Sequence, residues 1–287
     1  MRRTNNTGFK TKYRLQLSIP VQLALTFGLM LLFSILLNFL LNWEKEGYQG
    51  LGEPEAIPAA VYSAEGFYYG EDGRLYYEDD VWTSRQVVDV SSFQHEVDWQ
   101  QVAGDGIDMA MIRLGYRGYE SGLLNLDPYF EQNVKGAREA GLETGVYFFS
   151  QALTVEEAEE EARFVLKHIR RKGIDGPVAF DMEHIEGVER ISALTVEEKT
   201  AIADAFCQTI EKRGYETLIY GNPKWFTEDV DLSLLTHRDI WLAHYVQLTG
   251  WPSWYRMWQY TDRGSVAGIE GGVDLSVQLV LKSYKAV

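Results

Sequence analysis

The sequence predicts an α/β barrel. From Gln86 onward, short apolar runs alternate with segments that carry helix-start and helix-stop residues. Such runs are typical of strands that are buried in a parallel sheet. Repeated strand–helix units indicate a parallel sheet, and about eight strands in about 200 residues indicate that the sheet closes into a barrel.

The expected strands are short and mostly apolar. They cover Gln86–Val90, Met109–Leu114, Thr144–Phe149, Val178–Asp181, Thr217–Tyr220, Ile240–Ala243 and Met257–Gln259. Helix signals lie between several of these strands, where an N-terminal cap is followed by a closing glycine. The three helices expected on this basis run from Asp127-Pro128 to Gly141, from the capping box Thr154–Glu157 to Gly173, and from the capping box Thr195–Glu198 to Gly214.

The amino-terminal end has the features of a membrane anchor. Residues 15–43 contain no charged side chain, and five basic residues but no acidic residue precede them. As a helix, the apolar run Val21–Leu41 would be about 31 Å long, which matches the hydrocarbon thickness of a bilayer. A buried core helix would be shorter, and a cleaved signal peptide would have a small-residue cleavage site. The sequence therefore predicts a cytoplasmic segment at 1–18, a single transmembrane helix at 19–43 and an extracellular body.

Residues 44–85 differ in composition from residues 86–287. They contain several glycines and prolines, and two short aromatic runs at 66–69 and 74–77 flank a turn at 70–73. This pattern is typical of a small hairpin. We expect a stalk with a hairpin over 44–85 and the barrel domain over 86–287.

The charge of the body limits the possible partners. Residues 44–287 carry 22 basic and 42 acidic side chains, so a nucleic-acid backbone would be repelled. The single cysteine, Cys207, lies among apolar residues at helical spacing and is expected to be a buried core thiol. The five histidines form no His-x-His or His-x3-His pair, and the sequence predicts neither a metal ion nor a cofactor.

Two acidic residues at the end of one expected strand are the strongest candidates for catalysis. Asp181 and Glu183 follow the apolar run 177–180, and alternate residues of a strand point to the same side. Two neighbouring carboxylates repel each other, which raises the pKa of one of them. A neutral acid beside an anion is the arrangement that cleavage of a glycosidic bond requires.

Further residues at the expected strand ends fit a carbohydrate site. Asp89 ends the first barrel strand, and Asp274 follows a Gly-Gly-Val sequence, so both are expected at the barrel mouth. Aromatic side chains cover the apolar faces of sugar rings, and the last third of the barrel sequence is rich in them. They are Trp241, Tyr245, Trp251, Trp254, Tyr255, Trp258 and Tyr260, with Gln259 and Asp262 as polar neighbours.

With these residues in view, the chain from about Gln86 to about Leu281 resembles a glycoside hydrolase family 25 lysozyme, an N-acetylmuramidase. The order and spacing of several short motifs carry the resemblance. They are Val88–Ser91 with Phe93-Gln94 and Asp98-Trp99, Ile112-Arg113, Asp127 with Phe130 and Asn133, Gly145–Phe149, Phe180–Glu183, Ile219-Tyr220, Trp241–Tyr245, Trp258–Tyr260, and Gly268-Ile269 through Val273–Leu275.

The resemblance implies an irregular barrel of eight strands with fewer helices than a full eightfold barrel. It also implies that Glu183 is the general acid, that Asp181 is its partner and that Asp89 and Asp274 are further acids of the pocket. The implied substrate contacts are Arg113, Tyr147, Tyr220, Trp241, Tyr245, Trp258 and Gln259. One departure from the family is Phe148, because many members have a histidine there that would contribute to a subsite.

The implied reaction is hydrolysis of the β-1,4 bond between N-acetylmuramic acid and N-acetylglucosamine in peptidoglycan. Because Asp181 is so close to Glu183, we expect it to orient the substrate's own acetamido group as the nucleophile, with retention of configuration. Inversion with Asp89 or Asp274 as base is the alternative mechanism. Two other functions remain open: a membrane-tethered module that binds glycan without cutting it, and a metal-dependent envelope polysaccharide deacetylase.

Overall fold

A computed structural model describes residues 21, 27–34 and 47–282, and the chain forms two compact units, Met1–Gly47 and Tyr48–Val287. In the first unit, residues 27–34 are helical. Most of the expected transmembrane helix at 19–43, and all of the expected cytoplasmic segment at 1–18, lie outside the described residues. Within the described residues, no helix has both the length and the apolar character needed to cross a bilayer.

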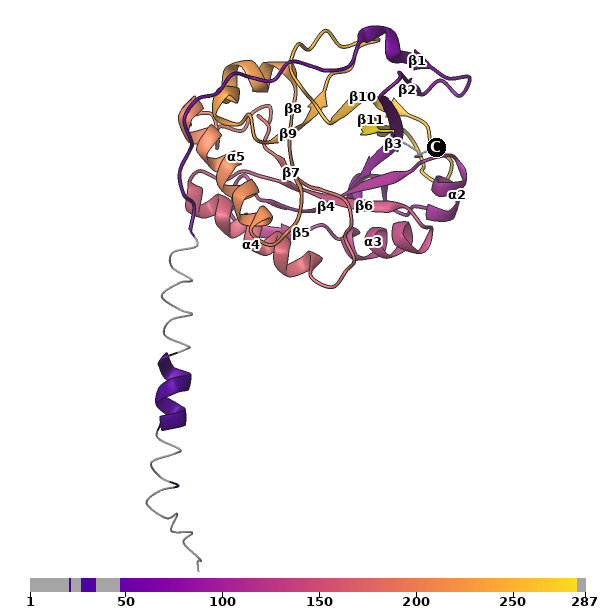
Figure 1. Ribbon diagram of the computed structural model, residues 1–287. Helices are drawn as coiled ribbons and strands as arrows, with labels where there is room; N and C mark the ends of the chain where they lie inside the picture. Colours follow the sequence, from indigo (N-terminus) through magenta and orange to yellow (C-terminus); the bar gives the residue numbers. More distant parts are fainter. Residues whose placement is uncertain (1–20, 22–26, 35–46, 283–287) are drawn as a thin grey trace, which may run out of the picture. The chain divides into compact units, whose positions relative to one another are not determined.

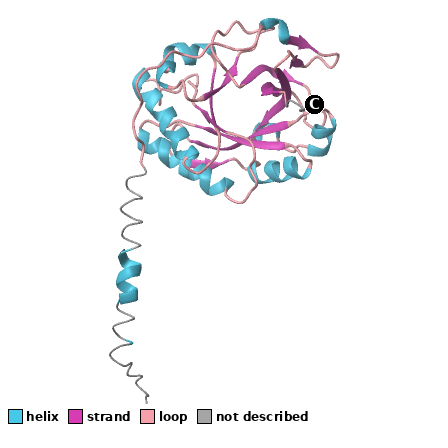
Figure 2. Cartoon of the chain, in the orientation of Figure 1, coloured by secondary structure: helices cyan, strands magenta, loops and turns pink. Residues whose placement is uncertain are grey.

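The second unit is built around a closed barrel of eight strands (Figures 1 and 2). In order around the barrel, they are β3 (Trp82–Val90), β4 (Met109–Arg117), β6 (Glu143–Phe149), β7 (Val178–Asp181), β8 (Thr217–Gly221), β9 (Asp239–Ala243), β10 (Met257–Gly264) and β11 (Val273–Leu281). Neighbouring strands from β3 to β10 are parallel. The last strand, β11, pairs antiparallel with both β10 and β3 and so closes the barrel. A short strand, β5 (Leu124–Leu126), pairs with the end of β4.

All seven expected strands are present, but the expectation of a purely parallel sheet is wrong at β11. In this strand apolar residues alternate with polar ones. The apolar residues Val273, Leu275 and Val277 belong to the outer core, whereas Asp274 and Ser276 accept hydrogen bonds from the side chains of Gln259 and Trp241. This alternation is typical of a strand with two different faces. A search for continuous apolar runs therefore misses it.

In the described part of the body, the α-helices all precede β8 and cover the first half of the barrel (Figure 2). They are α2 (Trp99–Gly104), α3 (Phe130–Glu139), α4 (Val155–Ile169) and α5 (Val196–Glu211). The capping box expected at Thr195 and Glu198 is confirmed. At Thr154 the side chain caps the Glu157 amide as expected, but the Glu157 carboxylate accepts from the Leu153 amide, so the box is not closed. The helix expected from Asp127 begins at Phe130 instead. The Asp127 carboxylate accepts hydrogen bonds from the Tyr129 amide, the Ser92 amide and the Arg113 guanidinium.

The connections of the second half contain two short helical turns, η4 (Trp225–Asp229) and η5 (Leu232–Leu234). Two further short helical turns, η2 (Ala64–Gly66) and η3 (Ser92–Gln94), lie before and just after β3. Apolar side chains form two layers. The inner cluster lies inside the barrel and includes Met109, Met111, Leu218 and Met257. The larger outer cluster lies between the strands and the helices and chain segments that pack on them.

The segment before the barrel covers the side that lacks helices. The expected hairpin consists of β1 (Phe67–Tyr69) and β2 (Leu75–Tyr77), which lie beside β10 and β3 (Figure 1). The Phe67 ring packs edge-on against Trp258, with 5.3 Å between centroids. Tyr62 donates a hydrogen bond to the Tyr255 carbonyl at 2.8 Å.

This packing differs from the expected stalk over 44–85. From Tyr48 onward the segment is bound to the barrel, through backbone bonds such as Glu55 to Ser233 at 2.8 Å and Ala60 to Pro252 at 3.0 Å. The aromatic runs that we interpreted as a hairpin on a stalk also provide part of the outer core. Residues 48–85 are therefore a structural part of the barrel.

Candidate active site

A cavity of about 230 Å³ opens at the carboxyl ends of the parallel strands. All four predicted acids line it, and they come from β3, β7 and the residues just after it, and β11. The full lining is Asp89, Ser91, Phe93, Gln94, Arg113, Tyr147, Phe149, Asp181, Glu183, Tyr220, Trp241, Gln259 and Asp274.

Asp181 and Glu183 face this cavity together. Asp181 is the last residue of β7 and is buried, whereas Glu183 lies just beyond the strand and is partly exposed. Burial raises the pKa of Asp181 well above its usual value, and the Glu183 charge adds to this rise. Burial also raises the pKa of Glu183. The two groups titrate as a pair, and proton uptake by one favours ionisation of the other.

A second pair of acids lies across the barrel closure. Asp89 and Asp274 are directly opposite each other in the antiparallel pairing of β3 and β11. Burial raises the pKa of Asp274 to about 6. Burial, together with the charge of Asp274, raises the pKa of Asp89 well above its usual value.

Gln259 of β10 binds both acids of this second pair. Its amide nitrogen donates to Asp89 at 2.9 Å and to Asp274 at 3.4 Å. Its amide oxygen accepts from the hydroxyls of Tyr220 and Tyr245, at 2.9 and 2.7 Å. An ionised carboxylate can only accept, so this is the orientation in which the amide nitrogen serves the two acids and the amide oxygen accepts from the two hydroxyls. The sequence predicts Gln259 as a substrate contact, and the structure buries it within this network.

Arg113 of β4 provides a positive charge at the edge of the cavity. It donates to Asp127 at 2.8 Å and to the Ser92 hydroxyl at 2.9 Å, and its guanidinium carbon lies 5.0 Å from the centroid of the Phe93 ring. Its charge acts against the rise in the Asp181 pKa. Its two polar partners hold Arg113 in place, so it is preorganised at the rim of the cavity.

Tyr147, Tyr220 and Trp241 form an aromatic wall below the acids. The Tyr220 and Trp241 rings are 4.9 Å apart between centroids, and Tyr147 packs edge-on against Trp241 at 6.2 Å. The indole nitrogen of Trp241 donates to Ser276 at 3.0 Å, which fixes the ring. The three predicted positions are therefore brought together in one pocket.

The structure does not place Trp258, a predicted substrate contact, in the cavity. Its ring is fully buried in the outer core, and its indole nitrogen donates to the His244 carbonyl at 2.8 Å. It faces away from the cavity because it precedes Gln259 on β10, and successive residues of a strand point to opposite sides. Phe148 lies outside the site for the same reason: it follows Tyr147 on β6 and packs against Phe164. The lack of a histidine at this position therefore removes no group from the cavity.

Tyr245 reaches the acids only through Gln259 and lines a neighbouring hollow rather than the cavity itself. The cavity also has four lining residues that the sequence analysis named only within motifs and not as site residues, which are Ser91, Phe93, Gln94 and Phe149. Phe149 was accessible to sequence reasoning, because it is two residues after Tyr147 on the same face of a strand. Ser91 and Gln94 form a capping box around η3, which turns the chain over the cavity.

This arrangement has the chemistry of a glycosidase. Two neighbouring acids can hold one proton between them, so one can protonate a leaving oxygen while the other, as an anion, stabilises the developing positive charge on the sugar. The aromatic wall offers apolar surface to a sugar ring. Within the described residues, no group of three or more His, Cys, Asp or Glu side chains has a metal-binding arrangement.

Comparison with known proteins agrees with this assignment. Residues 88–269 match the sequence profile of the glycosyl hydrolases family 25. The chain therefore belongs to this family and is a glycoside hydrolase.

Relatives and solved structures resemble the chain over similar regions. Uncharacterized protein YegX of Escherichia coli K12 is 30% identical over 195 residues, which cover 66% of this chain and 68% of that protein. The autolytic lysozyme of Clostridium acetobutylicum is 25% identical, over 66% of this chain and 54% of the lysozyme.

Among solved structures, the family 25 glycosyl hydrolase of Bacillus anthracis has a TM-score of 0.58 at 20% identity, covering 76% of this chain and 94% of that one. The autolysin LytC of Streptococcus pneumoniae, solved with a synthetic peptidoglycan ligand, has a TM-score of 0.62 at 21% identity. That match covers 77% of this chain and 52% of LytC, so the chain spans about half the length of LytC.

The raised pKa values predict how stability changes with pH. A carboxyl whose pKa is higher in the folded state stabilises the fold below its unfolded pKa of about 4, and this stabilisation is lost as the pH rises through the folded pKa. For Asp274 the loss extends to about pH 6. We expect Asp274→Asn to raise the free energy of unfolding at pH 7.5 by on the order of 1–2 kcal/mol and to flatten its pH dependence between about pH 4 and 6.

Urea unfolding at several pH values checks this expectation. Glu120→Gln, a change of an exposed acid outside the cavity, serves as the control and should leave the pH profile unchanged. An Asp274→Asn protein that is less stable at pH 7.5, with the wild-type pH dependence, would show that the carboxylate is not strained by its surroundings.

Proposed function

We propose that this protein hydrolyses the β-1,4 bond between N-acetylmuramic acid and N-acetylglucosamine in peptidoglycan. The main support is the pairing of Asp181 and Glu183 at the end of one strand, inside a cavity that also holds Asp89 and Asp274. Family membership and the lysozymes among the relatives support the same substrate class.

Glu183 is the proton donor in this proposal. It is the more accessible member of its pair, because it lies beyond the end of β7 while Asp181 is buried within the strand. Burial raises the pKa of Glu183, and it raises the pKa of Asp181 well above its usual value, so in the free protein the pair competes for one proton. A substrate N–H bonded to Asp181 favours the ionised form of Asp181 and so places the shared proton on Glu183. It can therefore protonate the glycosidic oxygen and, after the sugar leaves, accept a proton from the attacking water.

Asp181 orients the substrate's acetamido group in the proposed mechanism. Its Oδ1 atom is buried and forms no hydrogen bond within the described part of the chain. A buried carboxylate oxygen without a donor is costly, and the amide N–H of an N-acetyl group can supply one. The carbonyl oxygen of the same group would then attack the anomeric carbon as the glycosidic bond breaks, and Glu183 would deliver water to the resulting cyclic intermediate.

We also propose that the enzyme is held at the cell membrane by residues 19–43, with its barrel outside the cell. The support is the uncharged stretch at 15–43 and the five basic residues before it. A tether of this kind would restrict hydrolysis to wall material near the membrane and would favour local trimming of the cell's own wall.

Substitution of Glu183 tests the proposed activity. Glu183→Gln keeps the size of the side chain but has no proton to give, so turnover on purified peptidoglycan should fall by at least about a hundredfold. Mass analysis should show N-acetylmuramic acid at the new reducing ends that the wild type releases. The thermal melt of the variant should match or exceed that of the wild type, because one strained acid is removed.

A folded Glu183→Gln protein with near-normal turnover would refute the assignment of the proton donor. Asp231→Asn is a matched control, since this acid caps η5 away from the cavity. Reducing ends of N-acetylglucosamine from the wild type would show that a different bond is cut.

Cell fractionation tests the membrane proposal. The full chain should remain with membranes after a high-salt wash, and protease added to wall-stripped cells should remove the body from Glu44 onward. A chain that begins at Tyr48 should be released from the membrane fraction. Protection of the body from protease, or a mature protein that starts beyond Trp43, would contradict the tether.

A further inference from the structure

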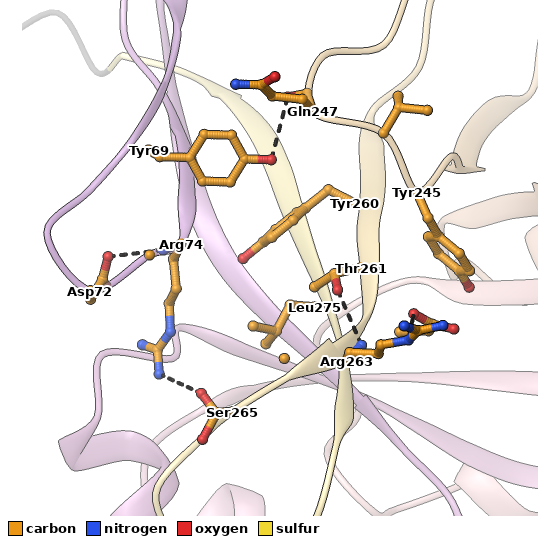
Figure 3. Close-up of a pocket in the computed structure, with 14 residues that line it drawn as sticks. Tyr69, Asp72, Arg74, Tyr245, Gln247, Tyr260, Thr261, Arg263, Ser265 and Leu275 are labelled. Atoms are coloured by element: carbon orange, nitrogen blue, oxygen red, sulfur yellow. Dashed lines mark hydrogen bonds and ion pairs between the residues drawn. The ribbon is translucent and has the colours of Figure 1, made fainter.

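A second hollow, larger than the cavity that holds the acids, lies between the hairpin and the ends of β9 and β10. Its volume is about 620 Å³, within the range of about 300–1,000 Å³ that is usual for ligand sites. Figure 3 shows its lining, which comes from the hairpin (Tyr69 and 72–74), the residues after β9 (245–247), β10 and the loop after it (260–265), and Leu275 of β11. We call this hollow the hairpin groove.

The hairpin is fixed in position on the barrel. The buried Arg74 forms an ion pair with Asp105 at the end of α2 and donates to the Ser265 carbonyl at 3.4 Å. The Tyr69 hydroxyl donates to the Gln247 carbonyl at 3.3 Å, across the groove mouth (Figure 3). The groove is therefore preformed, and a ligand does not have to order its walls on binding.

The hairpin groove is linked to the acids through Tyr245. This residue lines the groove, and its hydroxyl donates to Gln259, which in turn binds Asp89. Asp262 lines the groove as well, and its charge contributes to the raised pKa of Asp274 in the neighbouring cavity. The two hollows share no lining residue, but they adjoin at Tyr245 and Gln259 and at Asp274 and Leu275, so they are neighbours at the same end of the barrel.

The chemistry of the hairpin groove suits a sugar. Two aromatic rings are half exposed on its walls, with 45% of Tyr69 and 49% of Tyr245 accessible, and the buried Tyr260 lies between the segments that carry them. Aromatic faces bind the apolar C–H faces of sugar rings, while the polar edges of the groove can bond to hydroxyls. The lining carries two acids, Asp72 and Asp262, and two arginines, Arg74 and Arg263, so its formal charges balance. Arg74 binds Asp105, and Arg263 lies 3.5 Å from Asp262. This balance favours a neutral, hydroxyl-rich ligand over an ionic one.

We propose that the hairpin groove is an additional subsite that binds a sugar unit of the same glycan strand, away from the bond that is cut. The proposal rests on the function proposed above. The hairpin at 67–77 lies outside the part of the chain that matches the family profile, 88–269. Its consequence is a preference for long glycan strands.

Kinetics on peptide-free glycan strands of defined length test this subsite. Tyr69→Ala removes the ring from the groove wall and should raise KM on long strands by about three- to tenfold. The ratio of kcat/KM on long strands to that on the shortest cleaved fragment should fall by the same factor. Tyr69→Phe keeps the ring and should restore the preference for long strands.

Tyr68→Ala is the matched control. Tyr68 is the neighbouring residue on β1 and is similarly exposed, but its ring stacks on Tyr76 at 5.7 Å and does not line the groove. It should keep the wild-type length preference and a thermal melt like that of Tyr69→Ala. Binding can be measured without turnover in the Glu183→Gln protein. Calorimetry with long strands should show that adding Tyr69→Ala to this protein lowers its affinity by the same factor.

The outcomes separate the two proposals. A wild type that cleaves no glycan strand contradicts the proposed function. A wild type that cleaves them, with Tyr69→Ala retaining the wild-type KM on long strands, overturns the subsite alone. An equal loss of kcat/KM on long strands and on the shortest fragment also overturns the subsite, because the Tyr69 ring would then act only by supporting the fold.

Discussion

The active site depends on four carboxylates that are held in one cavity where the barrel closes. Burial raises the pKa of all four, and the charges of neighbouring acids add to the rise for Asp89, Asp181 and Asp274. Gln259 is the central contact, since it bonds to both acids of the β3–β11 pair and is itself oriented by two tyrosines. The antiparallel entry of β11 makes this possible, because it places Asp274 directly opposite Asp89. The strain in the cavity is the source of its chemistry, because an acid that holds its proton at higher pH is one that can give it to a leaving group.

The incomplete ring of helices has a structural consequence of its own. Beside β10 and β3 the outer face is covered by the chain from Tyr48 to Tyr77, whose aromatic residues pack on Trp258 and Tyr255. The same segment provides the Tyr69 wall of the hairpin groove. One addition to the barrel therefore both completes the core and extends the surface available to substrate.

Much of the fold and of the site was predictable from the sequence, for reasons that particular residues make clear. Strands such as Val178–Asp181 are continuous apolar runs, and caps such as Thr195 with Glu198 are local signals. Asp181 and Glu183 share a face because strands alternate. The alternating β11 and the packing of residues 48–77 depend on contacts between distant parts of the chain. The place of Trp258 was not predictable, because aromatic residues are common both in cores and in sugar-binding grooves, and only its position next to Gln259 on β10 determines which way it faces.

The central claim is that Asp181 and Glu183 act together from one strand, with the substrate's acetamido group as the nucleophile. This mechanism passes through two inversions at the anomeric carbon and so retains its configuration. The most direct test is proton NMR of the reducing end released in the first moments of hydrolysis, before the anomers equilibrate. The account predicts that the β anomer forms first. An α anomer as the first product would contradict it and would transfer the role of base to Asp89 or Asp274.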